Sequence, residues 1–439
     1  MASTGLAWPL RRRLAAACAT LVVVGCANGT EPSDGGSTTS SGKGATTATA
    51  GGSNSPGTNA NGTGGAGGDA AMGGGGMHAE GGSGPGGGGT GGADEGSWSP
   101  TTTLGAPTGR GDHTVIWSGS EVLVWGGRTS NGGGTLLDSG GRYDPSSDAW
   151  LTMSTTGAPS PRYAHTAVWT GTEMIVWGGW GTPGMLATGG IYTPSTNSWT
   201  ALPTAGAPTL AEHAAVWTGS AMLVWGMDEN ANPVGARYAP GGGWSAISSV
   251  AAPAVRQYAP AVWTGAEMII WGGTSLVDDG LDTGARYNPA NDTWTPMSTD
   301  GAPAGRAFHS VVWTGSEMIV WGGRHEDCGA CTELDDGGRY NPDTDTWSPL
   351  SAVGAPPPRR HHHAVWTGSE MILWSGIGDG IHLDDGGRYE PNDDSWVMLP
   401  TRGAPAPRSG PNAVWSGAEM VVWGGYGGGG LATGGRYVP

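Results

Sequence analysis

Two short apolar segments recur together along most of the chain. One copy reads His-Thr-Ala-Val-Trp-Thr-Gly at residues 165–171 and then Glu-Met-Ile-Val-Trp-Gly-Gly at residues 173–179. Both segments are almost continuously apolar with a glycine turn between them, which predicts two adjacent β-strands buried on both faces. A shorter, more polar pair follows, such as residues 337–342 and 345–350, with Asn-Pro and Asp turn residues between its members. Each copy therefore predicts four strands.

The unit occurs seven times between residues 98 and 439, at about 49 residues a copy. Each copy has a first Trp followed by (Thr/Ser)-Gly, a second Trp eight residues later, a Tyr and, in six copies, a third Trp. The first tryptophans are Trp117, Trp169, Trp217, Trp263, Trp313, Trp366 and Trp415. Seven four-stranded units predict an all-β, seven-bladed β-propeller. The 86 glycines and 31 prolines exclude a helical solenoid.

The ends of the repeat region indicate how the ring closes. The seventh unit stops at Val438-Pro439, before a fourth strand. Trp98 lies 19 residues before Trp117, and the same interval separates Trp150 from Trp169. We therefore expect the strand around Trp98 to complete the last blade, which leaves the ring without an open edge.

The glycine doublet after the second strand, the Tyr of the third strand and the Trp of the fourth resemble the kelch repeat. The resemblance covers residues 98–439 and implies a kelch-like propeller. It does not identify a function, because one fold can carry many. The third unit departs most, with Leu210 for an Arg, Ala221 for a Glu and Met227 for the second Gly, and the sixth unit has Ser375 for the first Gly.

The first residues resemble an export signal. Three arginines at 11–13 precede an apolar run that ends Val-Val-Gly-Cys at Cys26, similar to the lipobox of bacterial lipoproteins. This predicts lipidation at Cys26 and, with Ala27 next, an outer-membrane lipoprotein; an ordinary secretory signal is the alternative. The Gly/Ser/Thr-rich residues that follow cannot build a core. We therefore expect a signal peptide at 1–25, a lipid-anchored disordered linker at 26–97 and the propeller at 98–439.

The charge balance limits the partners. Acidic residues outnumber basic ones by 37 to 20, for a net charge of −17, which argues against a nucleic-acid surface. We expect membrane contact through the lipid anchor alone, and a monomer.

Comparison of the seven copies separates scaffold from variable surface. Only the interval from the second Trp to the Tyr changes much, between 13 and 19 residues, so the loops between second and third strands are the expected recognition face. An Arg seven residues before the first Trp recurs in six copies, and a His three residues after it in five. We expect these repeated residues to brace the blades. They are Arg110, Arg162, Arg256, Arg306, Arg359 and Arg408, and His113, His165, His213, His309 and His362.

Three residues that do not repeat are the candidate ligand-binding set. Arg128, Trp180 and Tyr426 directly follow the glycine doublet in blades one, two and seven, which are neighbours in a closed ring. As an exposed cluster they could stack on a sugar or contact a protein partner; local loop packing is the alternative.

Acidic residues gather in the variable loops of blades three to six, and we call them the acidic sector. They are Asp228, Glu229, Asp278, Asp279, Asp282, Glu326, Asp327, Asp335, Asp336, Asp379, Asp384 and Asp385. They could orient a cationic partner, hold Ca²⁺, or pair with the third-strand Arg. No EF-hand pattern is present, and we expect no resident cofactor.

Two cysteines lie close together in the longest variable loop. In an exported protein Cys328 and Cys331 predict a local disulfide, with zinc as the alternative. His361 and His363 flank the repeated His362, and because neighbouring strand residues point to opposite faces we do not expect a metal tract.

The favoured function is a non-catalytic binding module for a glycan or an envelope or extracellular protein. Some kelch-like propellers are copper-radical oxidases or sialic-acid epimerases, so a carbohydrate-active enzyme is the alternative. The oxidase site needs a Cys crosslinked to a Tyr near the ring axis, and the available cysteines lie elsewhere. We assign no catalytic residue.

Overall fold

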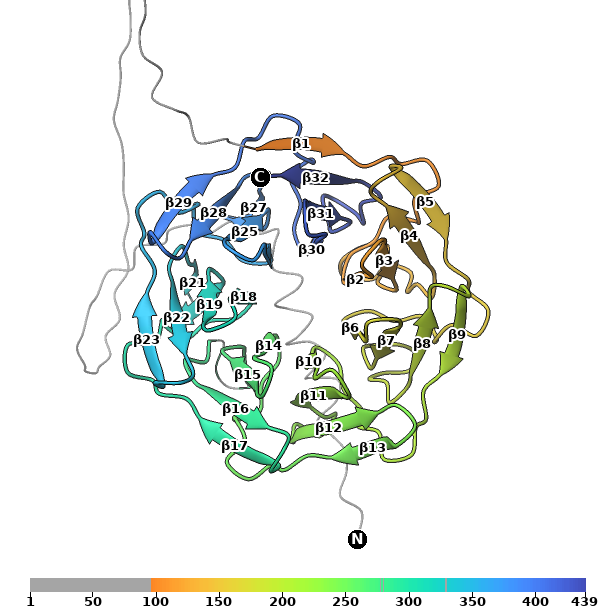
Figure 1. The fold of residues 1–439 in the computed structure, drawn as a ribbon, viewed down its shortest axis with the longest axis horizontal. Helices are drawn as coiled ribbons and strands as arrows, with labels where there is room; N and C mark the ends of the chain where they lie inside the picture. Colours follow the sequence, from red (N-terminus) through yellow and green to blue (C-terminus); the bar gives the residue numbers. More distant parts are fainter. Residues whose placement is uncertain (1–95, 277, 279, 328–329) are drawn as a thin grey trace, which may run out of the picture. The chain divides into compact units, whose positions relative to one another are not determined.

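The computed structural model describes residues 96–439 apart from 277, 279, 328 and 329, and it does not describe the side chains of residues 326–331. In this part the chain forms seven four-stranded antiparallel sheets arranged in a ring (Figure 1). The seven-bladed, all-β propeller is therefore confirmed. The described part of the chain contains no helix of the length and apolarity needed to cross a bilayer.

In blades one to six the strands follow chain order from the centre outward, and in blade seven the N-terminal strand is outermost. Blade one contains β2 (Thr114–Trp117), β3 (Val122–Trp125), β4 (Gly140–Asp144) and β5 (Ala149–Thr152). Blade two contains β6 (Thr166–Trp169), β7 (Met174–Trp177), β8 (Gly189–Thr193) and β9 (Ser198–Ala201). Blade three contains β10 (Ala214–Trp217), β11 (Met222–Met227), β12 (Pro233–Ala239) and β13 (Gly243–Ala246). Blade four contains β14 (Ala261–Trp263), β15 (Met268–Trp271), β16 (Gly284–Asn288) and β17 (Thr293–Pro296).

The remaining blades follow the same order, with two added loop hairpins. Blade five contains β18 (Ser310–Trp313), β19 (Met318–Trp321), β22 (Gly337–Asn341) and β23 (Thr346–Pro349), with the hairpin β20 (Arg324–Asp327) and β21 (Ala330–Glu333). Blade six contains β24 (His363–Trp366), β25 (Met371–Trp374), β28 (Gly386–Glu390) and β29 (Ser395–Met398), with the hairpin β26 (Ile377–Gly378) and β27 (Ile381–His382). Blade seven contains β30 (Asn412–Trp415), β31 (Met420–Trp423), β32 (Gly434–Val438) and β1 (Ser97–Pro100).

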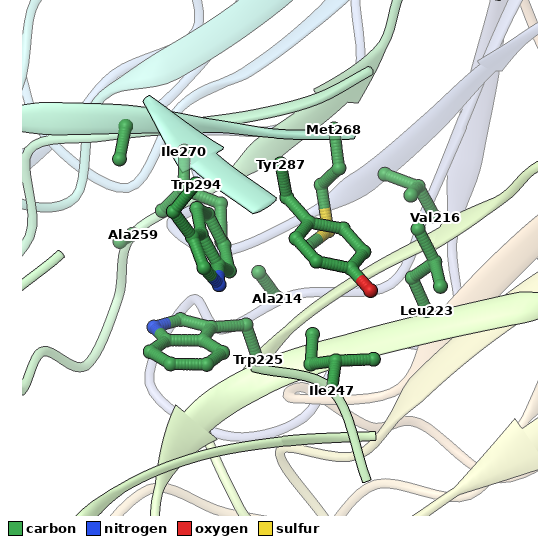
Figure 2. Close-up of a cluster of buried hydrophobic side chains, with 11 residues drawn as sticks. Ala214, Val216, Leu223, Trp225, Ile247, Ala259, Met268, Ile270, Tyr287 and Trp294 are labelled. Atoms are coloured by element: carbon green, nitrogen blue, oxygen red, sulfur yellow. The ribbon is translucent and has the colours of Figure 1, made fainter. Parts of the chain in front are cut away.

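The hydrophobic core consists of layers between neighbouring blades. Every residue of the second strands is buried, because these strands lie inside their sheets and a neighbouring blade covers each face. Figure 2 shows one layer, in which Trp225 and Ile247 of blade three pack against Met268, Tyr287 and Trp294 of blade four. The near-continuous apolar pattern of these strands follows from this two-sided burial.

The N-terminal strand closes the ring as expected. β1 pairs antiparallel with β32, and Trp98 lies opposite Tyr437. The ring centroid of Trp98 lies 5.3 Å from that of Trp374 in blade six and 5.2 Å from that of Tyr437. The first described strand thus joins blade seven to the layer between blades six and seven.

The repeated arginines brace the blades, as predicted. Arg162 is fully buried and donates hydrogen bonds to the carbonyl oxygens of Gly178 at 3.0 Å and Thr188 at 2.6 Å. Burial without a carboxylate partner lowers the pKa of Arg162 to about 10. The other five arginines make the equivalent pair of bonds, so each ties the chain entering a blade to the ends of its second and third strands.

The repeated histidines connect neighbouring blades. Nε2 of His213 and Oγ1 of Thr166 in the preceding blade lie 2.8 Å apart, and the same bond joins His165 to Thr114 at 3.0 Å. The His ring lies against the first Gly of the preceding blade's doublet, and a Cβ added to Gly178 would be 2.8 Å from Cε1 of His213. This position must therefore be Gly wherever the following blade carries the His.

This contact explains the irregular doublet of blade six. Blades four and seven have Ala259 and Pro411 in place of the His, and the blades before them are the ones whose doublets depart from the repeat. Blade six carries Ser375 at a φ of 72°, with its hydroxyl donating to the carbonyl oxygen of Arg408 at 2.5 Å. In blade three the second strand instead continues through Gly226 to Met227.

Candidate functional site

One residue from each blade forms a ring around the centre of the propeller, and we call these seven residues the rim. Each follows the repeated Arg position by two residues and precedes the innermost strand of its blade (Figure 1). All seven have left-handed backbones, with φ between 51° and 58°. They are Asp112, Ala164, Glu212, Tyr258, Phe308, His361 and Gly410.

Backbone contacts fix the rim to the scaffold. The amide of Ala164 donates to the carbonyl of Asp112 in the preceding blade at 3.1 Å, and the amide of Gly410 donates to His361 at 2.8 Å. The residue before each rim position also forms a β-bridge to its blade's variable loop in six of the blades, for example Gly111 to Arg128. The backbone is thus alike in every blade, while the side chains range from Gly to Phe.

Asp112 joins two of the predicted ligand-binding residues. Its Oδ2 accepts hydrogen bonds from Nε of Arg128 at 2.6 Å and from the hydroxyl of Tyr426 at 2.9 Å. The Arg128 guanidinium also lies 4.3 Å from the ring centroid of Tyr163. Burial acts to lower the pKa of Arg128, but the charges of Asp112 and Tyr426 and the hydrogen bonds to them together outweigh it, and the pKa is raised. Blades seven, one and two therefore meet through an acid that the sequence analysis did not select.

Trp180, the third predicted residue, takes part in a different network. Its Nε1 donates to Glu212 in blade three at 3.2 Å, and Gln257 donates to the other oxygen of Glu212 at 2.7 Å. Burial raises the pKa of Glu212. Tyr426 is only 7% exposed, so the three residues do not form the exposed cluster that the sequence analysis expected. The hydroxyl and ring of Tyr426 are buried by its partners across blades seven and one, and ligand binding by the three residues stays a prediction.

Aromatic side chains occupy the rim positions of blades four, five and six. The ring centroids of Tyr258 and Phe308 are 4.6 Å apart, and those of Phe308 and His361 are 4.3 Å apart. We call these three residues the aromatic stack. Phe308 is the only phenylalanine of the chain. The sequence signal was available: all three stand at one fixed distance from the repeated Arg position and differ from the residues of the other copies.

The acidic sector surrounds this half of the rim with negative charge. Seven of its members are exposed: Glu229, Asp278, Asp282, Asp335, Asp336, Asp379 and Asp384. Asp336 and Asp385 pair with the buried Arg306 and Arg359, each at 2.9 Å. Within the described residues, no group of three His, Cys, Asp or Glu side chains could hold a metal ion.

One alternative from the sequence, that these loop acids pair with the third-strand arginines, does not hold for the described residues. Four of those arginines pair with the glutamate that precedes the second strand of the same blade: Arg142 with Glu121 at 2.8 Å, Arg286 with Glu267 at 3.3 Å, Arg388 with Glu370 at 3.6 Å and Arg436 with Glu419 at 3.0 Å. These pairs lie toward the opposite, second face of the ring, at the other end of the strands from the variable loops. The loop acids Asp336 and Asp385 therefore pair with Arg306 and Arg359, which lie at the same end of the blade as the variable loops.

An open groove lies on the second face. It has a volume of about 600 Å³ and lies between blades seven and one, lined by Trp117, Glu121, Asp144, Glu419 and Arg436 among others. Most of these are repeated residues that pack or pair between blades. Side-chain variation therefore selects the rim, rather than this groove, as the candidate site.

The remaining predicted site residues lie outside the described part of the chain. Cys26 precedes residue 96, Cys328 is not described, and the side chain of Cys331 is not described. Lipidation at Cys26 and the disulfide therefore stay predictions.

Comparison with known proteins agrees with the repeat pattern. The family model described as the KLHDC2/KLHL20/DRC7 Kelch-repeats domain matches residues 92–237 and 242–425. A search of curated proteins finds no match. The matched segments include strands of all seven blades and most of the chain. The chain therefore belongs to the kelch-repeat family.

Proposed function

We propose that this protein is an exported, lipid-anchored kelch propeller that binds a protein partner through its rim and the variable loops around it. A kelch propeller is in general a protein-interaction module. The export and the anchor rest on the run that ends at Cys26. With both, the protein would be an outer-membrane lipoprotein of the cell envelope.

The observation that carries the proposal is the contrast between backbone and side chains at the rim. Seven residues with nearly the same φ present seven different side chains, among them two acids and three aromatic rings. A position that served only the scaffold would take one small residue in every blade, as Ala164 and Gly410 show is possible. Variation on a rigid framework is typical of a recognition surface.

A protein is the better-supported ligand class than a glycan. Among the residues predicted to stack on a sugar, Tyr426 is buried and its hydroxyl bonds Asp112, so its ring is not available for stacking. The exposed groups around the rim are mainly carboxylates spread over the loops of blades three to six. Dispersed charge around a small apolar centre fits the polar edge and apolar core of a protein interface.

Site-specific photo-crosslinking in the native host tests the proposal. A photoreactive phenylalanine analogue would replace Tyr258 on the rim or, as the control, the exposed Ser195 in the turn between β8 and β9 on the second face. We expect a crosslinked protein of defined mass in the envelope fraction from position 258 and none from position 195. The same adduct from both positions, or none from position 258, would contradict the assignment of the face.

A further inference from the structure

We propose that the rim takes a basic segment of the protein partner and places a lysine or arginine side chain of that segment on the aromatic stack. This inference rests on the proposed function and adds the chemistry of the partner. The aromatic stack supplies the contact at the centre, and the acidic sector supplies the attraction around it.

The aromatic stack has the geometry of a cation-binding surface. Tyr258, Phe308 and His361 come from three consecutive blades, and successive ring centroids are 4.6 and 4.3 Å apart. Tyr258 is 37% exposed, so part of the surface faces solvent. A cation within about 6 Å of an aromatic centroid is attracted by the electron-rich ring face. A guanidinium or ammonium group laid on this surface would contact one ring or two neighbouring rings.

The backbone gives independent support for a functional role. Bulky residues rarely adopt left-handed backbones, yet Tyr258, Phe308 and His361 do so at φ values of 53°, 58° and 54°. The same position holds Ala164 in blade two, so the fold does not require a large side chain there. Retaining strained aromatic residues at a tolerant position is typical of sites where the side chain serves recognition.

The charge around the stack favours a cation. Seven exposed carboxylates of the acidic sector lie in the loops of blades three to six, which include the blades that carry the stack. The side chain of Asp112 is 30% exposed, and its hydrogen bonds with Arg128 and Tyr426 both involve Oδ2. Glu212 accepts hydrogen bonds from Trp180 and Gln257, which are neutral and do not cancel its charge. With a net charge of −17, the whole chain attracts a basic partner.

Basic residues near the rim oppose this attraction only in part. Arg128 is paired with Asp112, and Arg360 is paired with Glu333. Arg324, at the start of β20, lies close enough to affect His361 electrostatically. The positive charges of Arg128 and Arg360 are thus offset by neighbouring carboxylates, whereas Asp336 is the one exposed loop acid with an arginine partner among the described residues.

Peptide binding to the full-length protein tests the inference. The probes are a fluorescent peptide of alternating lysine and glycine, the same peptide acetylated on its lysines, and a peptide of alternating glutamate and glycine. Fluorescence anisotropy at low and high salt would measure each affinity. We expect the lysine peptide to bind, more weakly at high salt, and the other two to bind much less.

Two pairs of variants separate recognition from stability and from net charge. Phe308→Ala introduces the residue that blade two already holds in this conformation, and should weaken lysine-peptide binding about tenfold without changing the melting temperature. Asp335→Asn with Asp384→Asn removes two exposed acids of blades five and six on the rim face. The control, Asp343→Asn with Asp393→Asn, removes two exposed acids of the same blades on the second face. Only the first pair should weaken binding.

Several results would overturn the inference. Equal binding of the acetylated or glutamate peptide would show that positive charge is not recognised. Unchanged affinity in Phe308→Ala, with the fold intact, would show that the stack only packs. Failure of the lysine peptide to bind, together with a specific crosslink from position 258, would refute the basic segment while leaving the proposed function standing.

Discussion

The buried histidines predict that the propeller loses stability in mild acid. Three of them, His113, His213 and His309, have pKa values lowered from 6.5 to about 3, chiefly because burial disfavours the charged ring. His165 and His362 are shifted the same way. Since the unfolded chain binds protons near pH 6.5 and the folded chain does not, this stability is complete above pH 6.5 and falls as the pH drops toward 3.

The size of the effect follows from linkage. Each such His costs about 1.4 kcal/mol of unfolding free energy per pH unit inside this window, or about 2 kcal/mol between pH 7 and 5. Five of them amount to roughly 10 kcal/mol, an upper value that is comparable to the total stability of many domains. Two glutamates act in the opposite direction, because the pKa values of Glu212 and Glu370 are raised by burial and their protonation favours the folded state. The histidines outnumber them, so stability should fall.

His213→Ala isolates one histidine. Blade four already has Ala259 at the equivalent position, so the backbone accepts the change. At pH 7.5 the variant loses the 2.8 Å bond to Thr166 and the packing of the ring, a cost of about 2 kcal/mol. The variant also lacks the histidine that takes up a proton only on unfolding. Its stability should therefore fall less steeply with acid and should equal that of the wild type near pH 5.

Equilibrium urea unfolding between pH 8 and 5, followed by tryptophan fluorescence, measures both effects. We expect the wild-type midpoint to drop steeply below pH 6.5 and the curve of His213→Ala to converge on it. Wild-type stability that stays constant over this range, or two curves that stay parallel, would refute the assignment of a buried neutral histidine.

Three further changes test other parts of the molecule. Trp98→Ala should reduce the unfolding free energy by about 3–5 kcal/mol and lower the melting temperature as much as Trp150→Ala does. An unchanged melting temperature in Trp98→Ala would show that β1 contributes little to closure. Cys26→Ser should move the protein from the membrane to the soluble fraction with its melting temperature unchanged, whereas a wild-type protein already in the soluble fraction would exclude the anchor. Pro411→His should destabilise by about 1–3 kcal/mol through a clash with Ser375, and adding Ser375→Gly should recover part of the loss in a double-mutant cycle; purely additive effects would contradict the contact.

The repeat made the scaffold predictable from the sequence. Residues that recur at one spacing share one environment, so the strands, the bracing role of Arg162 and its equivalents, and the closing strand at Trp98 could all be inferred. These features depend on position within the blade, and that is the information a repeat carries.

Contacts between blades were not predictable in the same way. The bond from Tyr426 to Asp112 joins residues 314 positions apart, and the spacing of one unit does not show which side chains of neighbouring units meet. The left-handed conformation of Phe308 could not be predicted from the sequence either, since nothing next to it in the sequence requires that conformation. The sequence analysis therefore selected Arg128 and Tyr426 but missed the acid between them and the aromatic stack, and its choice of the recognition face stays a prediction.

The structure also provides a way to sort the departures from the repeat. Ser375 replaces a Gly where the next blade has lost its His, so a partner in the neighbouring blade accounts for the change and it belongs to the scaffold. Phe308 packs against Tyr258 and His361, but it replaces no lost contact between blades. The bond between rim backbones is made in blade two by Ala164, without a large ring in the strained conformation. A departure that restores packing maintains the ring, whereas one that costs stability without restoring a contact requires an explanation outside the fold. By this criterion the rim, rather than the irregular glycine doublets, is the part of the propeller for which we propose a role in recognition.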